Sequence, residues 1–285
     1  MILIAESGST KTDWVLLKSS GEVFLKTKTP GLNPSVFPED ELKKRLLENP
    51  EFAKYSREIQ KVYFYGAGCG TPTPAAIIKK VLHEVFPNAR IEVKEDLAAA
   101  VFAVTDKPGI ICILGTGSNS CYFDGSTLHL PVASLGYVLM DEGSGNYFGK
   151  ELIRDYFYNR MPENLAREFE SQFDLNPDRI KINLYKKPNP NSYLASFARF
   201  IFDSKEKNHS YFEKLLKKGI NKFMEYRVLC FKNAKEVPIH FVGSIAYFSR
   251  ELIESCCFEN QLTLGKIIQK PMDGLIDYHL GRFKN

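Results

Sequence analysis

The first half of the chain alternates short apolar runs with charged or small-residue segments. The apolar runs predict strands at residues 2–6, 13–18, 22–27, 61–65 and 91–93. Helix-forming segments lie between and after them. They begin near Pro38, at Thr73 as the N-cap with Pro74 in the first turn (ending near Phe86), and at Asp96. The predicted order is therefore βββ-α-β-α-β-α.

The second half of the chain restarts the same plan. A strand at 110–114 is followed by a small-residue turn, a second strand and the Asp124-Gly125 pair typical of a tight hairpin. A largely helical stretch, from about Tyr147 to Lys232, then interrupts the pattern, and its many Phe and Tyr residues predict buried helix faces. The plan resumes with a buried strand at 238–243 and a helix from about Ile245.

This repetition implies an α/β fold made of two duplicated domains. A boundary near 104–108 separates an N-terminal domain, 1–104, from a C-terminal domain, 105–271, which carries the helical insertion. The last helix, within 272–285, is a candidate addition to the first domain. A cleft between the two halves is the expected binding site.

The turn that follows the first strand of each half has the same plan of glycine and hydroxyl residues. Gly8-Ser9 in the first turn matches Gly117-Ser118 in the second, and Thr10, Lys11, Gly115 and Thr116 flank these pairs. Glycines let backbone N–H groups approach a ligand closely, and hydroxyl groups add donors, so such turns suit phosphate oxygens. A single turn of this kind is usually only a turn. Two matched copies favour phosphate binding, one copy on each side of a nucleotide's phosphate tail.

Composition narrows the possible partners. The 38 basic and 34 acidic residues give a net charge of +4 without a long basic block, so no nucleic-acid partner is expected. No apolar run is as long as a membrane-spanning helix, and no signal peptide is indicated at the start. The six cysteines form no Cys-x-x-Cys pair. These features predict a cytoplasmic, reduced protein without a membrane partner.

Four segments together resemble the actin/hexokinase/Hsp70-type ATPase superfamily, most closely its N-acetylglucosamine kinase branch. That branch is grouped with the activator ATPases of 2-hydroxyacyl-CoA dehydratases. Ser7–Trp14 and Gly115–Asn119 resemble the family's two phosphate motifs. Leu135–Ser144 is similar to the segment that closes over the sugar, and Val242–Ala246 is similar to the adenosine motif. The resemblance implies two ribonuclease H-like (actin-like ATPase) domains around a central cleft, with a helical insertion in the second.

The resemblance also assigns roles at the catalytic centre. Asp96 would be the general base that accepts the proton of the attacking sugar hydroxyl; an N-cap role is the structural alternative, and both can hold together. Glu6 stands where the family usually has Asp, and would hold Mg²⁺ mostly through water. Glu95, beside Asp96, is expected to be a surface residue.

The remaining site residues implied by the resemblance fall into three groups. Phosphate contacts are expected from Gly8, Ser9, Thr10, Lys11, Gly115, Thr116 and Gly117, adenosine contacts from Gly243 and Ser244, and sugar contacts from Asn33, Ser118, Asn119 and Asp141. Each has a plainer alternative: strand propensity for Thr10, simple exposure for Lys11, turn chemistry for Asn33 and Asn119, and a helix cap for the segment that begins at Asp141.

The function implied is an ATP-dependent sugar kinase that uses Mg²⁺ and phosphorylates an amino sugar, with the 6-hydroxyl of N-acetylglucosamine favoured. Leu135 and Tyr137 replace the Trp and His common in the sugar-closing segment, so the identity of the sugar stays open. Two other functions remain. An iron–sulfur activator ATPase would need thiolate ligands, for which Cys69 is the one suggestive residue. A non-catalytic sugar or nucleotide sensor would fit the Glu6 substitution. A homodimer contact is an alternative use of the aromatic helical surface.

Overall fold

The computed structural model describes residues 1–8 and 10–281, and it divides into two compact units. Unit 1 is Met1–Asp106 together with the segment that begins at Pro271, and unit 2 is Lys107–Lys270. No helix in the described part of the chain is long and apolar enough to cross a membrane.

Unit 1 is built on a five-stranded mixed sheet with the order β3-β2-β1-β4-β5. The first three strands form antiparallel hairpins, whereas β4 and β5 run parallel to β1. The elements of this unit are β1 (Ile2–Ser7), β2 (Lys11–Leu17), β3 (Val23–Pro30), α1 (Glu39–Leu47), α2 (Pro50–Tyr55), β4 (Lys61–Gly66), α3 (Pro72–Val85), β5 (Arg90–Glu95), α4 (Asp96–Val104) and α13 (Met272–His279).

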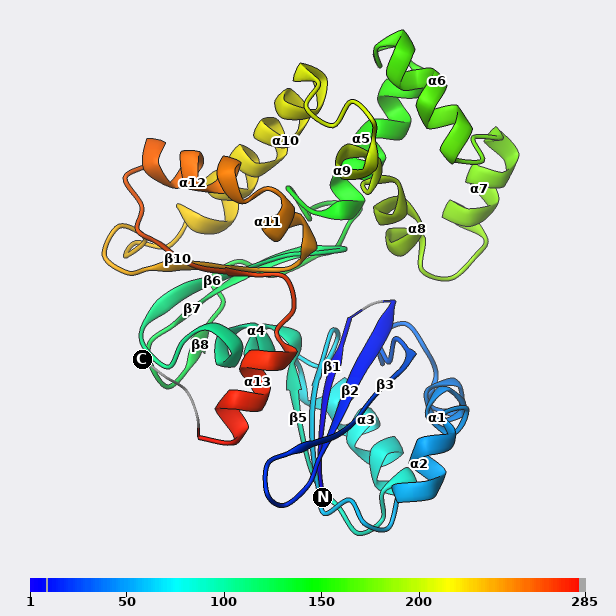
Figure 1. Cartoon of the computed structure of the whole chain (residues 1–285), viewed down its shortest axis with the longest axis vertical. Helices are drawn as coiled ribbons and strands as arrows, with labels where there is room; N and C mark the ends of the chain where they lie inside the picture. Colours follow the sequence, from blue (N-terminus) through cyan, green and yellow to red (C-terminus); the bar gives the residue numbers. More distant parts are fainter. Residues whose placement is uncertain (9, 282–285) are drawn as a thin grey trace. The chain divides into compact units, whose positions relative to one another are not determined.

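Figure 1 shows helices on both faces of this sheet, with α1–α3 on one side and α4 and α13 on the other. Alternate residues along β1 and β2 therefore enter different cores, which is the consequence of the two-residue period of a strand. Trp14 is a core residue that packs edge-on against Phe52 of α2, with the ring centroids 4.9 Å apart.

The start of α3 differs from the sequence-based expectation. Thr71 is the N-cap and Pro72 the first helical residue, in place of Thr73 and Pro74. Because the first-turn N–H groups have no partner within a helix, a proline is tolerated at more than one position there. Both prolines therefore lie inside the first turn, and the earlier one marks the boundary.

The last helix packs against α4 at very short range. A Cβ built on Gly274 of α13 would lie 2.3 Å from the carbonyl oxygen of Ala103. Only a residue without a side chain permits this approach. The small side chains of α4, which include Ala98, Ala99 and Ala100, are buried.

Unit 2 repeats the sheet of unit 1. Its strand order is β10-β9-β6-β7-β8, so in both sheets the first strand is central, with an antiparallel meander on one side and two parallel strands on the other. The predicted α/β duplication is confirmed, including the hairpin turn at Asp124-Gly125, where Asp124 N donates to Thr127 O. The strand β10 was not predicted, because its sequence, LGKII, contains a glycine and a lysine.

The strands of unit 2 are β6 (Gly109–Leu114), β7 (Ser118–Phe123), β8 (Leu128–His129), β9 (Ile239–Val242) and β10 (Leu264–Ile268). Its helices are α5 (Gly145–Phe157), α6 (Glu163–Gln172), α7 (Pro177–Tyr185), α8 (Pro190–Phe197), α9 (Phe200–Asp203), α10 (Ser210–Phe223), the π-helix η1 (Met224–Val228), α11 (Ser244–Phe248) and α12 (Arg250–Glu259). Helices α5, α10, α11 and α12 lie on one side of this sheet (Figure 1).

The aromatic residues of the helical insertion are mostly core residues, as predicted. Phe197, Phe200, Phe212 and Phe223 are buried, and their rings join the side chains of β6 and β9 in one hydrophobic cluster. Helices α5 and α8 approach so closely that a Cβ on Gly149 would overlap the carbonyl oxygen of Leu194. The insertion is therefore firmly packed on the second sheet.

A Gly274→Ala substitution tests the contact between α13 and α4. Alanine in place of glycine inside a helix ordinarily stabilises by about 0.5–1 kcal/mol. Here the added methyl group meets backbone, so we expect a loss of about 1–3 kcal/mol, measured as a lower urea midpoint. Asp277→Ala, at an exposed position of the same helix, is the control. A raised midpoint for Gly274→Ala would contradict the close contact.

Candidate functional site

The first hairpin turn of unit 1 is closed by a backbone hydrogen bond. Gly8 N donates to Lys11 O at 3.0 Å, between the ends of β1 and β2. Ser9, at the tip, lies outside the described residues. The Lys11 ammonium is half-exposed and pairs with Asp13 at 2.6 Å. Glu6 lies directly opposite Asp13 in the strand register, so the two carboxylates share one face of the sheet.

Hydrogen bonds attach this turn to two neighbouring loops. Leu32 N donates to Ser7 Oγ at 3.0 Å, Gly31 N donates to Thr10 O at 3.0 Å, and Ala67 N donates to Ser7 O at 2.9 Å. Ser7 is buried and also shares a hydrogen bond with Thr12. The ends of the turn are thus bonded to the chain on both sides.

The loop that follows β4 brings Asn33 and the β5–α4 junction to one place in unit 1. A Cβ on Gly68 would lie 2.2 Å from Asn33 Oδ1, and one on Gly70 would lie 3.0 Å from Glu95 Oε2. Asn33 Oδ1 accepts from Ser35 N, which is the turn chemistry considered as its alternative role. The expectation for Glu95 was wrong, because this side chain is half-buried against Gly70 and burial raises the pKa of its carboxyl.

Asp96 is the first residue of α4, and Glu95 takes the N-cap position without a side-chain cap. The Asp96 carboxylate accepts from Leu97 N at 2.9 Å and stays partly accessible to solvent. Burial is the largest influence on its pKa and raises it, while the hydrogen bonds from the helix N-terminus partly oppose this. A desolvated carboxylate held by backbone donors is well suited to accept a proton near neutral pH.

Cys69 lies in the same loop but is a poor ligand for an iron–sulfur cluster. The side chain is 5% exposed, and burial, with the neighbouring Asp96 and Glu95, raises the pKa of the thiol to about 12. Cluster ligation requires the thiolate. The described residues contain no group of three or more His, Cys, Asp or Glu side chains placed to hold a metal.

The second hairpin, in unit 2, is joined to the start of α5 by backbone hydrogen bonds. Gly145 N donates to Gly115 O at 2.8 Å, and Asn146 N donates to Thr116 O at 2.9 Å. Within the turn, Gly115 N donates to Gly117 O at 3.0 Å. The helix start and the turn therefore form one rigid piece.

Asp141 lies beneath this turn and links it to α5. It is 6% exposed and has a φ of 71°, and its carboxylate accepts from Ser118 N and from Asn146 Nδ2 at 3.2 and 2.7 Å. Burial is the largest effect and raises its pKa, against these hydrogen bonds. Ser144, not Asp141, caps α5, by accepting from Tyr147 N. Ser118 Oγ donates to Glu142 O, so this hydroxyl is also used inside the unit.

A buried arginine, which the sequence analysis did not predict, lies beside Asn119. Arg227, on the π-helix η1, is 2% exposed and donates from Nη2 to Asn119 Oδ1 at 3.2 Å. Its Nη1 donates to Val132 O at 3.0 Å. Among the described residues, Arg227 makes no ion pair with a carboxylate within 4.0 Å, although Asp141 lies near enough to be influenced by its charge.

Gly243 ends β9 in a conformation that requires glycine. Its φ is 124°, and a Cβ there would lie 2.3 Å from Leu114 O, at the end of the neighbouring strand β6. Ser244 then begins α11. The first turn of α11 consequently lies beside the second hairpin.

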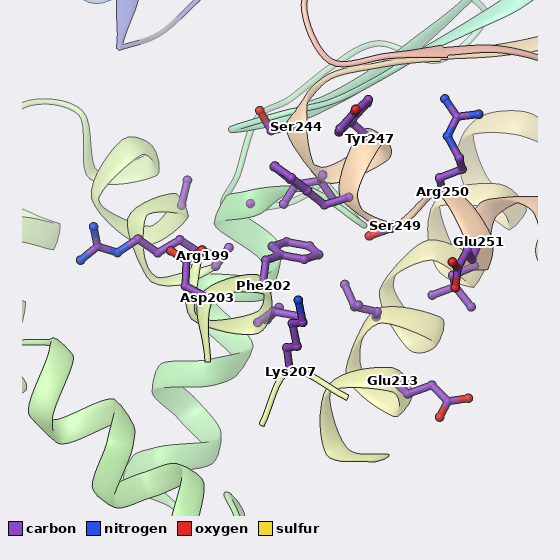
Figure 2. A pocket seen from close by; sticks show the side chains of 18 of the residues that line it. Arg199, Phe202, Asp203, Lys207, Glu213, Ser244, Tyr247, Ser249, Arg250 and Glu251 are labelled. Atoms are coloured by element: carbon purple, nitrogen blue, oxygen red, sulfur yellow. The ribbon is translucent and has the colours of Figure 1, made fainter. Parts of the chain in front are cut away.

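A pocket of about 1190 Å³ opens at this junction, within unit 2. Its lining includes Gly115 and Thr116 of the hairpin, Gly145 of α5 and Ser244 of α11. Figure 2 shows two of its walls: Arg199, Phe202, Asp203 and Lys207 come from α9 and its flanks, and Ser244, Tyr247, Ser249 and Arg250 from α11 and the start of α12. Its volume exceeds the range usual for drug-sized ligands, about 300–1,000 Å³.

The lining of this pocket suits a ligand with an aromatic part and an anionic part. Phe202 and Phe248 lie 5.4 Å apart by ring centroids, and Tyr247 and Phe248 are both exposed. Arg199, Lys207 and Arg250 supply positive charge, while Asp203, Glu213 and Glu251 balance it.

The predicted site residues thus fall into two sets. Unit 1 gathers Asp96 and Asn33 around the loop after β4, with Glu6, Gly8, Thr10 and Lys11 on the adjoining hairpin. Unit 2 gathers Gly115, Thr116, Gly117, Ser118, Asn119 and Asp141 around the second hairpin, with Gly243 and Ser244 beside it.

Comparison with solved structures places this arrangement in a known class. The chain is 39% identical to a candidate N-acetylglucosamine kinase from Porphyromonas gingivalis, over 99% of both chains, with a TM-score of 0.91. A candidate N-acetylglucosamine kinase from Chromobacterium violaceum shares the fold at 15% identity, over 97% of this chain and 98% of that one, with a TM-score of 0.71. A ROK-family glucokinase from Streptomyces griseus, solved with glucose and AMPPNP, does so at 12% identity, over 97% of both chains, with a TM-score of 0.55.

The fold is therefore that of the actin/hexokinase superfamily of ATPases, with the expected ribonuclease H-like units. Within this superfamily, the chain belongs to the N-acetylglucosamine kinase-like family. No protein-family model and no curated protein matches the chain.

Two glycine substitutions separate structural from ligand-facing roles at the second hairpin. Gly243→Ala forces alanine into a backbone region reserved for glycine and against Leu114 O, so we expect a loss of about 3 kcal/mol or more of unfolding free energy. Gly115→Ala is the matched control, because a Cβ there has nothing within 4 Å. Equal unfolding midpoints for the two variants in urea would contradict this assignment.

Proposed function

We propose that the protein is an ATP-dependent sugar kinase whose general base is Asp96. The observation that carries the proposal is the state of this carboxylate: desolvated, oriented by Leu97 N and still partly accessible, beside a loop that also holds Asn33. The 39% identity to a candidate N-acetylglucosamine kinase supports an amino sugar as the acceptor, with the 6-hydroxyl of N-acetylglucosamine preferred.

In unit 2, ATP would bind through the second hairpin and the pocket. Gly115, Thr116 and Gly117 would line the phosphate site. The N–H groups of Thr116 and Gly117 would face phosphate oxygens, while Gly115 N keeps its hydrogen bond to Gly117 O. Gly243 and Ser244 would allow the ribose and base to approach α11, where Tyr247 and Phe248 offer aromatic surface. The first hairpin, with Gly8, Thr10 and Lys11, would contact the terminal phosphates.

Mg²⁺ fits the donor set of unit 1. Glu6 and Asp13 lie opposite each other on one sheet face and offer hard oxygen donors. This ion is usually held by one or two carboxylates together with water and substrate phosphates, so a dedicated cage is not needed. When bound, it would neutralise charge on the transferring phosphoryl group. The longer Glu6 side chain would suit contact through water.

In unit 1, Asn33 and Asp96 are the proposed sugar contacts. In unit 2, the proposed sugar contacts are Ser118, Asn119 and Asp141. Both carboxylate oxygens of Asp141 already accept one hydrogen bond, and each retains a second acceptor position. Asp96 would accept the proton of the attacking hydroxyl as the phosphoryl group transfers. Phosphoryl transfer depends mainly on such positioning and charge neutralisation, which rigid turns and buried carboxylates provide.

The direct test is ADP release from Mg-ATP by the purified protein, with and without a panel of hexosamines and hexoses. Mass spectrometry would identify the phosphosugar. We expect release that depends on an N-acetylated hexosamine. Release without any sugar would favour an ATPase of another function, and sugar binding without turnover would favour a sensor.

Asp96→Asn should lower kcat for sugar phosphorylation by at least 10²-fold, since a positioned general base contributes roughly that factor or more. The KM for ATP should stay within about twofold of the wild-type value. Glu95→Gln is the neighbouring comparison and should lower kcat by less than tenfold. A kcat for Asp96→Asn within a factor of five of the wild type would remove Asp96 from the role of base.

The pH dependence of kcat/KM should follow the raised pKa of Asp96. A general base works only when deprotonated, so activity falls as the pH drops through its pKa. Because burial raises that pKa, the acid limb should lie above the ordinary aspartate value of 3.8. An acid limb at or below 3.8, measured with an ADP-coupled assay in a constant-ionic-strength buffer, would contradict the prediction.

A further inference from the structure

The amide group of Asn119 has a defined orientation. Its Oδ1 faces Ser120 N at 2.9 Å and Arg227 Nη2 at 3.2 Å. A backbone N–H and a guanidinium can only donate hydrogen bonds, so the atom that they share must be the amide oxygen. The Nδ2 group consequently points elsewhere, and it has no hydrogen-bond partner among residues 1–8 and 10–281.

Arg227 is itself held in place by two further hydrogen bonds. Its own carbonyl oxygen accepts from Ser120 Oγ at 2.6 Å, while Nη1 bonds to Val132 O just before the segment 135–144. The residue belongs to η1, and π-helical turns of this kind are frequent at functional sites. A buried guanidinium without an ion pair is costly, so hydrogen bonds to Asn119 and Val132 are needed to keep it there.

We propose that Arg227 is a positioning residue that fixes Asn119 as a hydrogen-bond donor toward the sugar, so that the site selects a ligand oxygen able to accept. The inference rests on the proposed function for the identity of the ligand. Arg227 itself is too deeply buried to touch a substrate. Arg227 acts by donating a hydrogen bond to Asn119 Oδ1, so that only the NH₂ group of Asn119 is left for the ligand. The positive charge of the guanidinium also makes that NH₂ group a stronger donor and disfavours a cationic ligand group.

Three variants test this role through the KM for the sugar found in the panel above. Arg227→Gln releases Asn119 Oδ1 from the charge, so the KM for the sugar should rise at least fivefold, with the KM for ATP unchanged. Arg227→Lys keeps the positive charge but loses the planar guanidinium that bonds to both Asn119 Oδ1 and Val132 O. The rise in the KM for the sugar should therefore be smaller than in Arg227→Gln. Arg154→Gln, an exposed arginine on α5, is the matched control and should leave both KM values unchanged.

Asn119→Asp tests whether residue 119 donates a hydrogen bond to the sugar or accepts one from it. One carboxylate oxygen can keep the bonds from Ser120 N and Arg227, so the fold should be retained, but the ligand-facing donor is lost. The KM for the sugar should rise at least tenfold, and more than in Asn119→Ala. A KM for Asn119→Asp equal to or below the wild-type value would overturn the donor assignment.

A double-mutant cycle establishes that Arg227 acts through Asn119. In an Asn119→Ala background, Arg227→Gln should change the KM for the sugar by less than twofold, because the residue on which it acts is gone. Full additivity of the two effects, or a drop in kcat without a change in KM for Arg227→Gln alone, would show a merely structural arginine and overturn the proposal.

The orientation can also be measured without turnover. In protein labelled with ¹⁵N-asparagine, the side-chain NH₂ signal that disappears in Asn119→Ala should shift in Arg227→Gln and stay unchanged in Arg154→Gln. An unchanged signal in Arg227→Gln would overturn the positioning role even if no sugar were phosphorylated. Wild-type protein that phosphorylates no sugar, with the shift present, would refute only the kinase function.

Discussion

The docking of the α5 N-terminus on the second hairpin is the interaction on which the site of unit 2 depends. Two backbone hydrogen bonds, from Gly145 N and Asn146 N to Gly115 O and Thr116 O, hold the backbone of the turn in one conformation. Asp141 completes the connection through Ser118 and Asn146. Backbone donors that are already oriented need no reorganisation when charge develops on a ligand, which is the main requirement of phosphoryl transfer.

Unit 1 meets the same requirement with different bonds. Its hairpin is fixed by Ser7, which bonds to the chain at Leu32 and Ala67, and not by a helix start. The two halves therefore share strand order while their turns are supported differently. The two units also differ in what lies beside the hairpin: unit 1 carries the desolvated carboxylate of Asp96, and unit 2 carries the large pocket.

The sequence was sufficient for the fold class because periodic apolar runs and matched turns are local features. The strands around both hairpins and the buried aromatic residues of the insertion were predicted correctly. Short or interrupted sequence patterns predicted the secondary structure less reliably. The strand β10 is interrupted by glycine and lysine, and the start of α3 was misplaced because two prolines compete for its first turn.

The site was predictable where residues adjoin in sequence, and not where they meet only through folding. Glu95 was expected at the surface, because nothing near it in sequence reveals the close approach of Gly70. Arg227 was missed for the same reason, since Asn119 and Val132 lie 108 and 95 positions away along the chain. A lone arginine in a helical region has no local pattern that marks it as buried.

The close contact of α13 with α4 also bears on the order in which the molecule is made. Unit 2 is a continuous stretch of chain between the two segments of unit 1, so its whole sequence is synthesised before α13. Unit 1 begins first but lacks the helix that packs on α4 until α13 has been made. The alanines of α4 therefore wait for their cover while all of unit 2 is synthesised, and unit 1 is completed after the chain of unit 2.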